Sequence, residues 1–298
     1  MKKSKGKKFL EKFIDLREID EHVFCNEVLT YLRTEHPKVH VHKSTWNLDK
    51  DFTLGSQFFG FGHFIVLDVG DTAGETIILG KGVCYDTGGY NLKTNMEGMY
   101  YDRNGALLAI AATLDTGVPS RVFFTSNVIR PDSPVHGQIM KQGKVKVVIS
   151  NTDAEGRIGL ASLLHSVRKT HKNVLTIATL TGAAVQVTGN RTYALVHSNE
   201  KSDYTSFMQL ALDGYDLWPA PFHKEYDVAV KSKINGADVD SCPKFAGAGS
   251  STAFSFLKTF AKDKHYMHLD IAAMMTTSDG NGLVWGLEEV EALLGILK

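Results

Sequence analysis

The sequence predicts an α/β fold in which a mixed, mostly parallel central sheet is covered by helices on both faces. Short, continuously apolar runs, such as 64–67 and 174–180, have the length and composition of strands buried on both faces. Amphipathic segments with a helical period, such as 155–169, alternate with these runs. The 298 residues show no internal repeat and no low-complexity linker, and 43% of them are hydrophobic. We therefore expect one large domain with a sizeable core.

The first predicted element is a helix over 16–35. Apolar residues recur there every three to five positions, and Pro37 follows at the distance expected beyond a helix end. A polar stretch without a clear pattern continues to about residue 58. The lysine-rich start of the chain, up to residue 8, precedes no long apolar run. We therefore expect a frayed, solvated terminus there, and neither a signal peptide nor a nucleic-acid-binding tail.

From residue 60 onward, predicted strands and helices alternate. Apolar runs rich in β-branched residues predict strands over 64–67, 76–79, 121–125, 144–149, 174–180, 193–197 and 267–271. Apolar stripes of helical period predict helices over 97–115, 155–169, 203–213, 251–261 and 287–297. This alternation is the pattern of a sheet with helices on both faces.

The composition argues against several classes of protein. The chain has 33 basic and 33 acidic residues, so its bulk charge attracts neither nucleic acid nor an acidic membrane. No apolar run reaches the roughly 18 to 20 residues that span a bilayer. Cys25, Cys84 and Cys242 are far apart and form no CxxC pair, so we expect no disulfide framework and a cytoplasmic location. Cys84 is expected to be a packing residue, and His268 to satisfy a hydrogen bond in the core.

A charged heptapeptide at 151–157 carries Asp153, Glu155 and Arg157 at alternate positions. In an extended chain, residues two apart project to the same side, so the two carboxylates can face the same cations. A second interpretation is a charged helix N-terminus that Thr152 or Asp153 caps, with Glu155 in the first turn. The heptapeptide alone does not decide between the two.

A glycine-rich block at 80–93 carries Lys81, Asp86 and Lys93, and the spacing of a phosphate-binding P-loop is absent from it. We expect a strand to end at 80–82 and the glycines after Asp86 to allow a tight turn. Asp102 lies at a predicted helix start, where a lone aspartate is usually a cap. Four carboxylates gathered at one place need protons or cations to offset their repulsion, and two divalent ions would do so.

Taken together, these motifs resemble the M17 family, the leucyl aminopeptidases. The family heptapeptide NTDAEGR is reproduced letter for letter at 151–157, and the block GKGxxFDSGGxxxK appears at 80–93 with Tyr85 for Phe and Thr87 for Ser. Further matches follow at 130–131, 180–183 and 268–272. The resemblance covers about residues 60–290. It implies a dinuclear-metal catalytic domain at 61–298, preceded at 1–60 by a short helix and edge segment where the family's N-terminal domain is largely absent.

The resemblance implies a role for each matched position. Two divalent ions, zinc or manganese, or else cobalt or magnesium, would be held by Lys81, Asp86, Asp102, Asp153 and Glu155. Asp86 and Glu155 would bridge them, and Lys81 would bind as a neutral amine. Lys93 would remain cationic and stabilise the oxyanion, while Arg157 would hold a bicarbonate-like anion that relays a proton. The pocket for the first side chain of the substrate would be lined by Met99, Thr181, Gly182, Ala183 and Met275.

The implied activity is the hydrolysis of the N-terminal residue, with a leucine-like preference, from short peptides through a water activated by two metals. A preference for dipeptides such as Cys-Gly is a variant of this hypothesis. The resemblance also implies a homo-oligomer, since family members are hexamers. Two other hypotheses stay open: a catalytically weak or inactive structural or regulatory homologue, and a nucleic-acid-binding protein, which the neutral charge disfavours.

Overall fold

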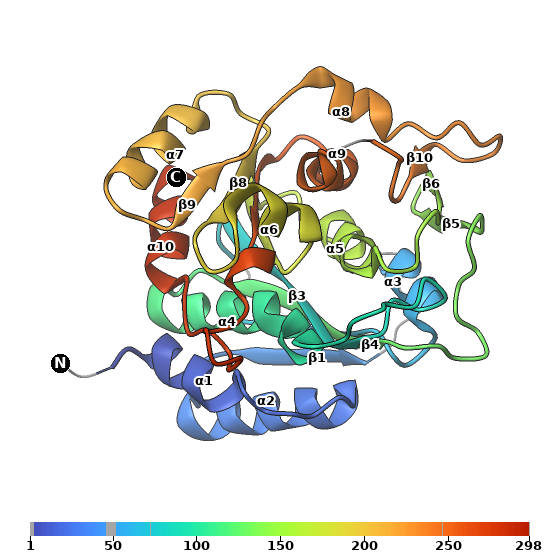
Figure 1. Cartoon of the computed structure of the whole chain (residues 1–298). Coiled ribbons are helices and arrows are strands. Elements are labelled where there is room, and N and C mark those ends of the chain that lie inside the picture. The colour runs from blue at the N-terminus through green and yellow to red at the C-terminus, as the bar shows by residue number, and fades with distance from the viewer. Residues whose placement is uncertain (1–2, 46–51, 72, 246, 298) are drawn as a thin grey trace.

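The computed structural model describes residues 3–45, 52–71, 73–245 and 247–297 of the chain (Figure 1). An eight-stranded mixed sheet forms its centre, with the strand order β1-β2-β4-β3-β7-β11-β8-β9. Helices cover both faces of this sheet. The predicted fold class is therefore confirmed. Residues 1–2 and part of the polar stretch predicted before residue 58, at 46–51, lie outside the described residues.

The central strands β4, β3, β7 and β11 run parallel to one another, and β8 runs parallel to β9. The pairs β1–β2, β2–β4 and β11–β8 are antiparallel. A smaller three-stranded sheet has the order β10-β6-β5. The bounds are β1 Val41–Thr45, β2 Ile65–Val69, β3 Thr76–Asp86, β4 Ser120–Asn127, β5 Ile139–Gln142, β6 Val145–Val148, β7 Asn173–Ala178, β8 Ala194–Ser198, β9 Leu217–Pro219, β10 Val239–Asp240 and β11 His265–Asp270.

Two groups of helices pack on opposite faces of the central sheet, and each buries its own apolar cluster against it. On one face lie α1 Lys5–Phe13, α2 Glu21–Glu35, α4 Asn104–Thr116, α7 Asp203–Leu212 and α10 Leu287–Ile296. On the other lie α3 Thr53–Phe59, α5 Glu155–His165 and α9 Gly249–Ala261. Shorter helices are η1 Met99–Arg103, α6 Gly182–Thr188, α8 Lys224–Ala229 and η2 Ala272–Met274. Among the described residues, no helix combines the length and apolar character needed to cross a bilayer.

The expectation of a frayed terminus up to residue 8 is wrong for residues 5–8, which form the first part of α1. Phe9, Leu10 and Phe13 share one stripe of this helix and are buried against the rest of the core, while the lysines face outward. Burial of three large apolar side chains outweighs the polar composition of the segment. The next helix begins at residue 21 rather than at 16, because the Asp20 side chain accepts hydrogen bonds from the first free N–H groups.

Strand β3 does not end at 80–82, as the glycines suggested, but continues to Asp86. Gly80 and Gly82 serve close packing instead. A Cβ atom at Gly80 would lie 2.7 Å from the Cα of Ala106 in α4, and one at Gly82 would lie 2.2 Å from the carbonyl oxygen of Phe123 in β4. The glycines thus let helix and strand approach closely. As a result β3 carries Lys81 and Asp86 to the carboxyl end of the sheet.

Two buried histidines sit side by side where β8 and β11 pair. His197 Nε2 is 2.9 Å from Ser250 Oγ, and His268 Nδ1 is 2.8 Å from Thr176 Oγ1, which confirms the hydrogen bond predicted for His268. Burial lowers the pKa of each imidazole to about 3, so both are neutral near pH 7.

These histidines should make the folded chain sensitive to acid. An unfolded histidine takes up its proton near pH 6.5, whereas these two resist it until about pH 3. Their contribution to stability is therefore complete above pH 6.5 and is lost as the pH falls toward 3. Together they should lower the free energy of unfolding by about 2.7 kcal/mol per pH unit in that window.

The measurement is urea unfolding in EDTA between pH 4 and 6, with His197→Gln as the comparison. The same carboxylates titrate in both proteins, so the difference between their pH slopes isolates His197. We expect the slope to fall by about 1.4 kcal/mol per pH unit in the variant. Equal slopes would show that His197 is not held neutral by the fold.

Candidate functional site

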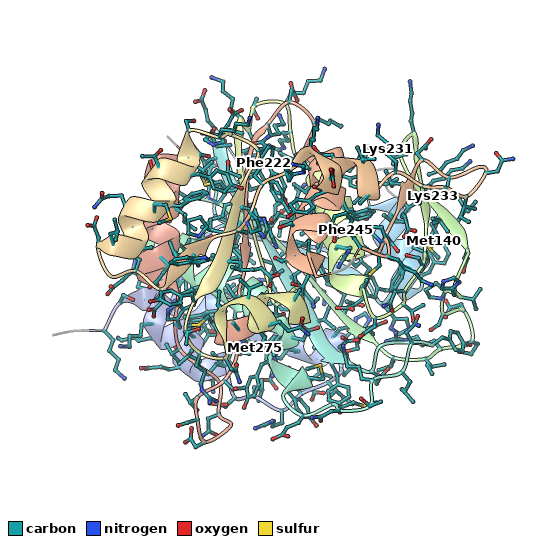
Figure 2. All side chains as sticks on the ribbon, turned by 45° about the horizontal axis from the view of Figure 1, so that its top comes forward. Met140, Phe222, Lys231, Lys233, Phe245 and Met275 are labelled. Atoms are coloured by element: carbon teal, nitrogen blue, oxygen red, sulfur yellow. The ribbon has the colours of Figure 1, made fainter. Side chains whose placement is uncertain are left out.

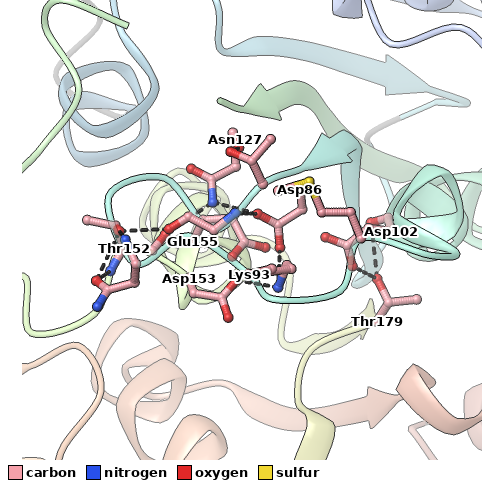
Figure 3. A network of polar contacts seen from close by, with 12 residues as sticks. Asp86, Lys93, Asp102, Asn127, Thr152, Asp153, Glu155 and Thr179 are labelled. Atoms are coloured by element: carbon pink, nitrogen blue, oxygen red, sulfur yellow. Dashed lines mark hydrogen bonds and ion pairs between the residues drawn. The ribbon is translucent and has the colours of Figure 1, made fainter. Parts of the chain in front are cut away.

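The charged residues singled out in the sequence converge at the carboxyl ends of β3 and β7, where parallel α/β sheets commonly bind ligands. Three separate segments meet there: the end of β3 with its following loop, η1, and the turn that leads into α5. Figure 3 shows the polar contacts among their side chains, here called the network. Its members are up to 98 residues apart in the chain, so only the folded structure brings them together.

One half of the network surrounds Lys81, which is almost fully buried. Its Nζ lies 2.7 Å from Asp102 Oδ1 and 2.8 Å from Glu155 Oε1, and it donates to the carbonyl oxygen of Thr179 at 2.7 Å. Thr179 Oγ1 also donates to Asp102 Oδ1 at 2.6 Å. Gly156 leaves room for this lysine, because a Cβ atom there would lie 2.7 Å from Lys81 Cδ and would push the side chain from its present position. Asp102 is therefore not a helix cap, as a lone aspartate would be, but a buried partner of Lys81.

The other half surrounds Lys93. Its Nζ lies 2.8 Å from Asp86 Oδ2 and also contacts Asp153 Oδ1. Asp86 is held in place by Gly88 N at 2.8 Å and by Asn127 Nδ2 at 2.6 Å. Gly88 has φ +87°, which allows the tight turn that was predicted between Asp86 and Lys93. The loop thus folds the lysine back over the carboxylate that precedes it.

The segment before α5 is a turn, not an extended chain. Ala154 occupies the N-cap position and no side chain caps the helix, so the extended segment and the caps by Thr152 or Asp153 are wrong. The second interpretation was right to place Glu155 in the first turn of a helix. The turn nevertheless directs Asp153 and Glu155 toward the same place. Ligand oxygens of Asp86, Asp153 and Glu155 all lie within 4.8 Å of one another.

Two residues of the network were missed by the sequence analysis. Asn127 ends β4 beside the end of β3, and its Nδ2 also donates to the carbonyl oxygen of Thr152 at 3.1 Å. Thr179 follows β7 and orients Asp102. Both are polar residues at the carboxyl ends of predicted parallel strands. Their position could have identified them in the sequence, because the carboxyl ends of parallel strands meet at one edge of the sheet.

Burial and mutual repulsion shift the pKa values of the carboxyl groups upward. Burial, together with the nearby charge of Asp86, raises the pKa of Glu155 to about 8. Burial raises the pKa of Asp102 to about 6 and raises that of Asp153 as well. Burial alone would lower the pKa of Lys81, but the carboxylates of Asp102 and Glu155 outweigh it and hold this pKa above the ordinary value. The carboxylates of the cluster therefore favour the binding of positively charged groups between them.

The donor set fits divalent metal ions. Three carboxylates from two segments face one point, and the buried Asp102 Oδ2 has no hydrogen-bond partner among the described residues. Hard oxygen donors of this kind bind zinc, manganese and magnesium. Lys81 and Lys93 supply the only ammonium groups in the network as described, and each contacts two of the carboxylates. Cations bound there would take over the neutralising role of these lysines.

Arg157 lies in the first turn of α5, beside the cluster but without an ion pair among the described residues. Its Nη1 donates to the carbonyl oxygen of Ser241 at 2.9 Å, and its buried Nε has no partner. A buried guanidinium N–H without an acceptor is costly. The arrangement is suited to a small anion that would accept this hydrogen bond.

Asp270 organises the region in which the pocket residues lie. This fully buried carboxylate ends β11 and accepts hydrogen bonds from Thr181 Oγ1 at 2.7 Å, Ser250 Oγ at 2.9 Å and Leu180 N at 3.1 Å. It thereby fixes the turn that carries Thr179 into the charged cluster. The predicted pocket residues lie at the start of η1, at the start of α6 and just after η2: Met99, Thr181, Gly182, Ala183 and Met275.

A second group of potential ligands, Glu21, His22 and His63, lies at the start of α2 and in the chain before β2. His63 Nδ1 is 2.5 Å from Glu21 Oε1, and the Arg130 guanidinium is 3.4 Å from the same oxygen. The arginine already supplies positive charge to the glutamate. We therefore interpret this group as a structural ion-pair network.

Comparison with known proteins gives a consistent result. The family described as "Cytosol aminopeptidase family, catalytic domain" matches residues 63–287. A probable cytosol aminopeptidase of Chlorobaculum tepidum is 34% identical over 255 residues, which are 79% of this chain and 50% of that protein. A probable cytosol aminopeptidase of Mycoplasma pneumoniae is 34% identical over 226 residues, 70% of this chain and 50% of that protein. The chain thus spans about half the length of these curated relatives.

A solved structure shares the fold. The leucyl aminopeptidase of Leishmania major, solved in complex with actinonin, matches with a TM-score of 0.81 at 21% sequence identity. The match covers 97% of this chain and 60% of the other. The mixed sheet with its two helical layers is therefore the fold of the leucyl aminopeptidase catalytic domain.

Proposed function

This chain belongs to the cytosol aminopeptidase family, M17, and we propose that it is a metal-dependent aminopeptidase that removes the N-terminal residue from short peptides. One observation carries the proposal: carboxylates from the end of β3, from η1 and from the turn before α5 gather around two lysines in a buried cluster. Such a concentration of negative charge is unfavourable unless cations bind it.

We assign the two metal sites to Lys81, Asp86, Asp102, Asp153 and Glu155. Two divalent ions at these positions would lower the pKa of a shared water and polarise the substrate carbonyl. Other groups of the chain would orient the metal ligands. Thr179 and Asn127 orient Asp102 and Asp86. Lys81 would act as a neutral ligand, which requires bound dications to overcome the carboxylates that hold its proton.

Lys93 is proposed to donate from Nζ to the oxyanion that develops on the substrate carbonyl. This ammonium contacts Asp86 and Asp153, so cations bound to those carboxylates would release it toward the substrate. Arg157 would hold a bicarbonate-like anion through its unpartnered Nε–H, and this anion would relay a proton. The second assignment gives the buried Arg157 Nε–H an acceptor.

Several broader features belong to the same proposal. Met99, Thr181, Gly182, Ala183 and Met275 would line the pocket for the first side chain and favour leucine-like residues. Residues 61–298 would form the catalytic domain, and residues 1–60 the N-terminal helices and edge. We also propose a homo-oligomer in the cytoplasm, in keeping with relatives named cytosol aminopeptidases.

The direct experiment is the release of leucine from leucine amide by purified protein with manganese or cobalt at pH 8 to 9. A free α-amine loses its proton near pH 8, and only the neutral amine can bind a metal, so activity should rise over pH 7 to 9. EDTA should abolish the activity and added metal should restore it. A folded sample that releases no leucine with any of these metals would favour the inactive structural or regulatory homologue instead.

A further inference from the structure

A pocket of about 640 Å³ adjoins the candidate site on the side of the small sheet. Its walls come from the ends of β6 and β10, from α8, and from the segments that follow α8 and β10. Pockets of this size are typical of small-molecule and peptide sites. Apolar side chains make up much of the lining: Val148, Val228, Ile234, Pro243 and Phe245.

Hydrogen bonds connect the lining of the pocket with the candidate site. β6 and β10 run parallel, and the chain after β6 leads directly into the heptapeptide of the site. Ser150 N donates to Ser241 Oγ at 3.1 Å, and Cys242 N donates to Ser150 Oγ at 3.0 Å. The carbonyl oxygen of Ser241 accepts the hydrogen bond from Arg157. Ser150 and Cys242, which line the pocket, thus flank the residue that positions the arginine of the site.

The short segment between Ser150 and Asp153 limits the distance between the pocket and the candidate site. Ser150 precedes Asp153 by three residues, a span of at most about 11 Å even when fully extended. Each residue of a bound peptide adds about 3.5 Å. A peptide whose scissile bond lies beside Asp153 would therefore reach the pocket with the second or third residue after that bond.

The pocket is rich in unpaired positive charge. Lys231, Lys233 and Lys244 line it, all three are exposed, and none forms a salt bridge within the described part of the chain. Lys231 and Lys233 lie near the upper right margin of the molecule in the view of Figure 2, and Phe245 lies closer to its centre. The lining carboxylates are Glu225 and Asp240. Asp240 Oδ1 already accepts from Cys242 N at 2.9 Å and from Ser150 Oγ.

We propose that this pocket is a subsite for the free α-carboxylate of short peptide substrates, on the leaving-group side of the scissile bond. The proposal rests on the proposed function and deepens it, because it makes the enzyme select short peptides with a free C-terminus. The apolar walls receive the side chains after the scissile bond, and the lysines receive the terminal charge.

The test compares kcat/KM for Leu-Gly-Gly with that for its C-terminal amide, using metal-loaded protein at low salt. We expect a preference of about tenfold for the free carboxylate, mostly in KM, which should shrink as salt is added. In the triple variant Lys231→Gln, Lys233→Gln, Lys244→Gln the ratio should fall to near one. The matched control Lys141→Gln, Lys144→Gln, Lys146→Gln removes the same charge from the β5–β6 hairpin and should keep the wild-type ratio.

Equal values for the two peptides in the wild type, or an equal loss of preference in both triple variants, would overturn the subsite. If the wild type cleaves neither peptide, the proposed function fails, and equilibrium binding of the two peptides then decides on the subsite separately. Tighter binding of the free carboxylate, lost only in the pocket variant, would support it. Equal dissociation constants would refute it.

Discussion

Replacing Lys93 with alanine should lower kcat by about 100- to 1,000-fold while leaving two metal ions bound per chain. The estimate follows from the roughly 3 to 4 kcal/mol that one oxyanion donor contributes in other hydrolases. Metal binding should persist or become tighter, because the Lys93 ammonium competes with cations for Asp86 and Asp153. The measurement pairs steady-state kinetics on leucine amide with metal analysis of the same sample.

Two companion variants sharpen this test. Lys93→Arg keeps the positive charge and should recover part of the rate, whereas Lys172→Ala removes an exposed lysine paired with Glu75 far from the cluster and should behave as wild type. An unchanged kcat in Lys93→Ala would show that the lysine does not contact the reacting carbonyl. Loss of metal together with rate would instead place Lys93 among the metal-positioning residues.

Replacing Glu155 with glutamine should reduce both bound metal and activity, the latter by about 1,000-fold or more. Glu155 is buried, contacts Lys81 and shares a point with Asp86 and Asp153, so we assign it a bridging position. An amide offers a single neutral oxygen in place of a carboxylate. We expect the metal content to fall from two ions per chain toward one, as measured by elemental analysis after dialysis.

The control for this variant is Glu75→Gln, which changes an exposed glutamate in a surface ion pair. It should retain both metal ions and full activity. If Glu155→Gln keeps two ions and loses only activity, Glu155 acts on the reacting groups and does not hold the metal. If it keeps both metal and activity, the assignment of this carboxylate is wrong.

Two motifs predicted Lys81, Asp86, Lys93, Asp153 and Glu155, and the family resemblance added Asp102, but the way in which these residues meet was not predicted. One of the two interpretations had Asp153 and Glu155 project together from an extended chain, and they come together through a turn instead. A spacing of two residues is compatible with both conformations, so sequence alone did not distinguish them. The closeness of these carboxylates is now a property of the structure, while their role as metal ligands stays a prediction.

The fold class followed from local patterns, and the errors came from tertiary packing. Strand β3 passes through Gly80 and Gly82 because α4 and β4 need the space, which no local pattern reveals. Helix α1 was not predicted because its segment is rich in lysine. Its three large apolar residues stabilise the helix only when they pack against the rest of the core. Asn127 and Thr179 belong to no motif, and their contacts with Asp86 and Asp102 arise from strands that are distant in sequence.

The central claim is that one chain holds two divalent ions close together at this cluster. Electron paramagnetic resonance of the protein loaded with manganese tests it most directly, because two ions about 3.5 to 4 Å apart are magnetically coupled. We predict two manganese ions per chain with a coupled spectrum that Glu155→Gln converts to that of isolated ions. A wild-type spectrum of isolated manganese, or a chain that retains no more than one ion, would contradict the claim.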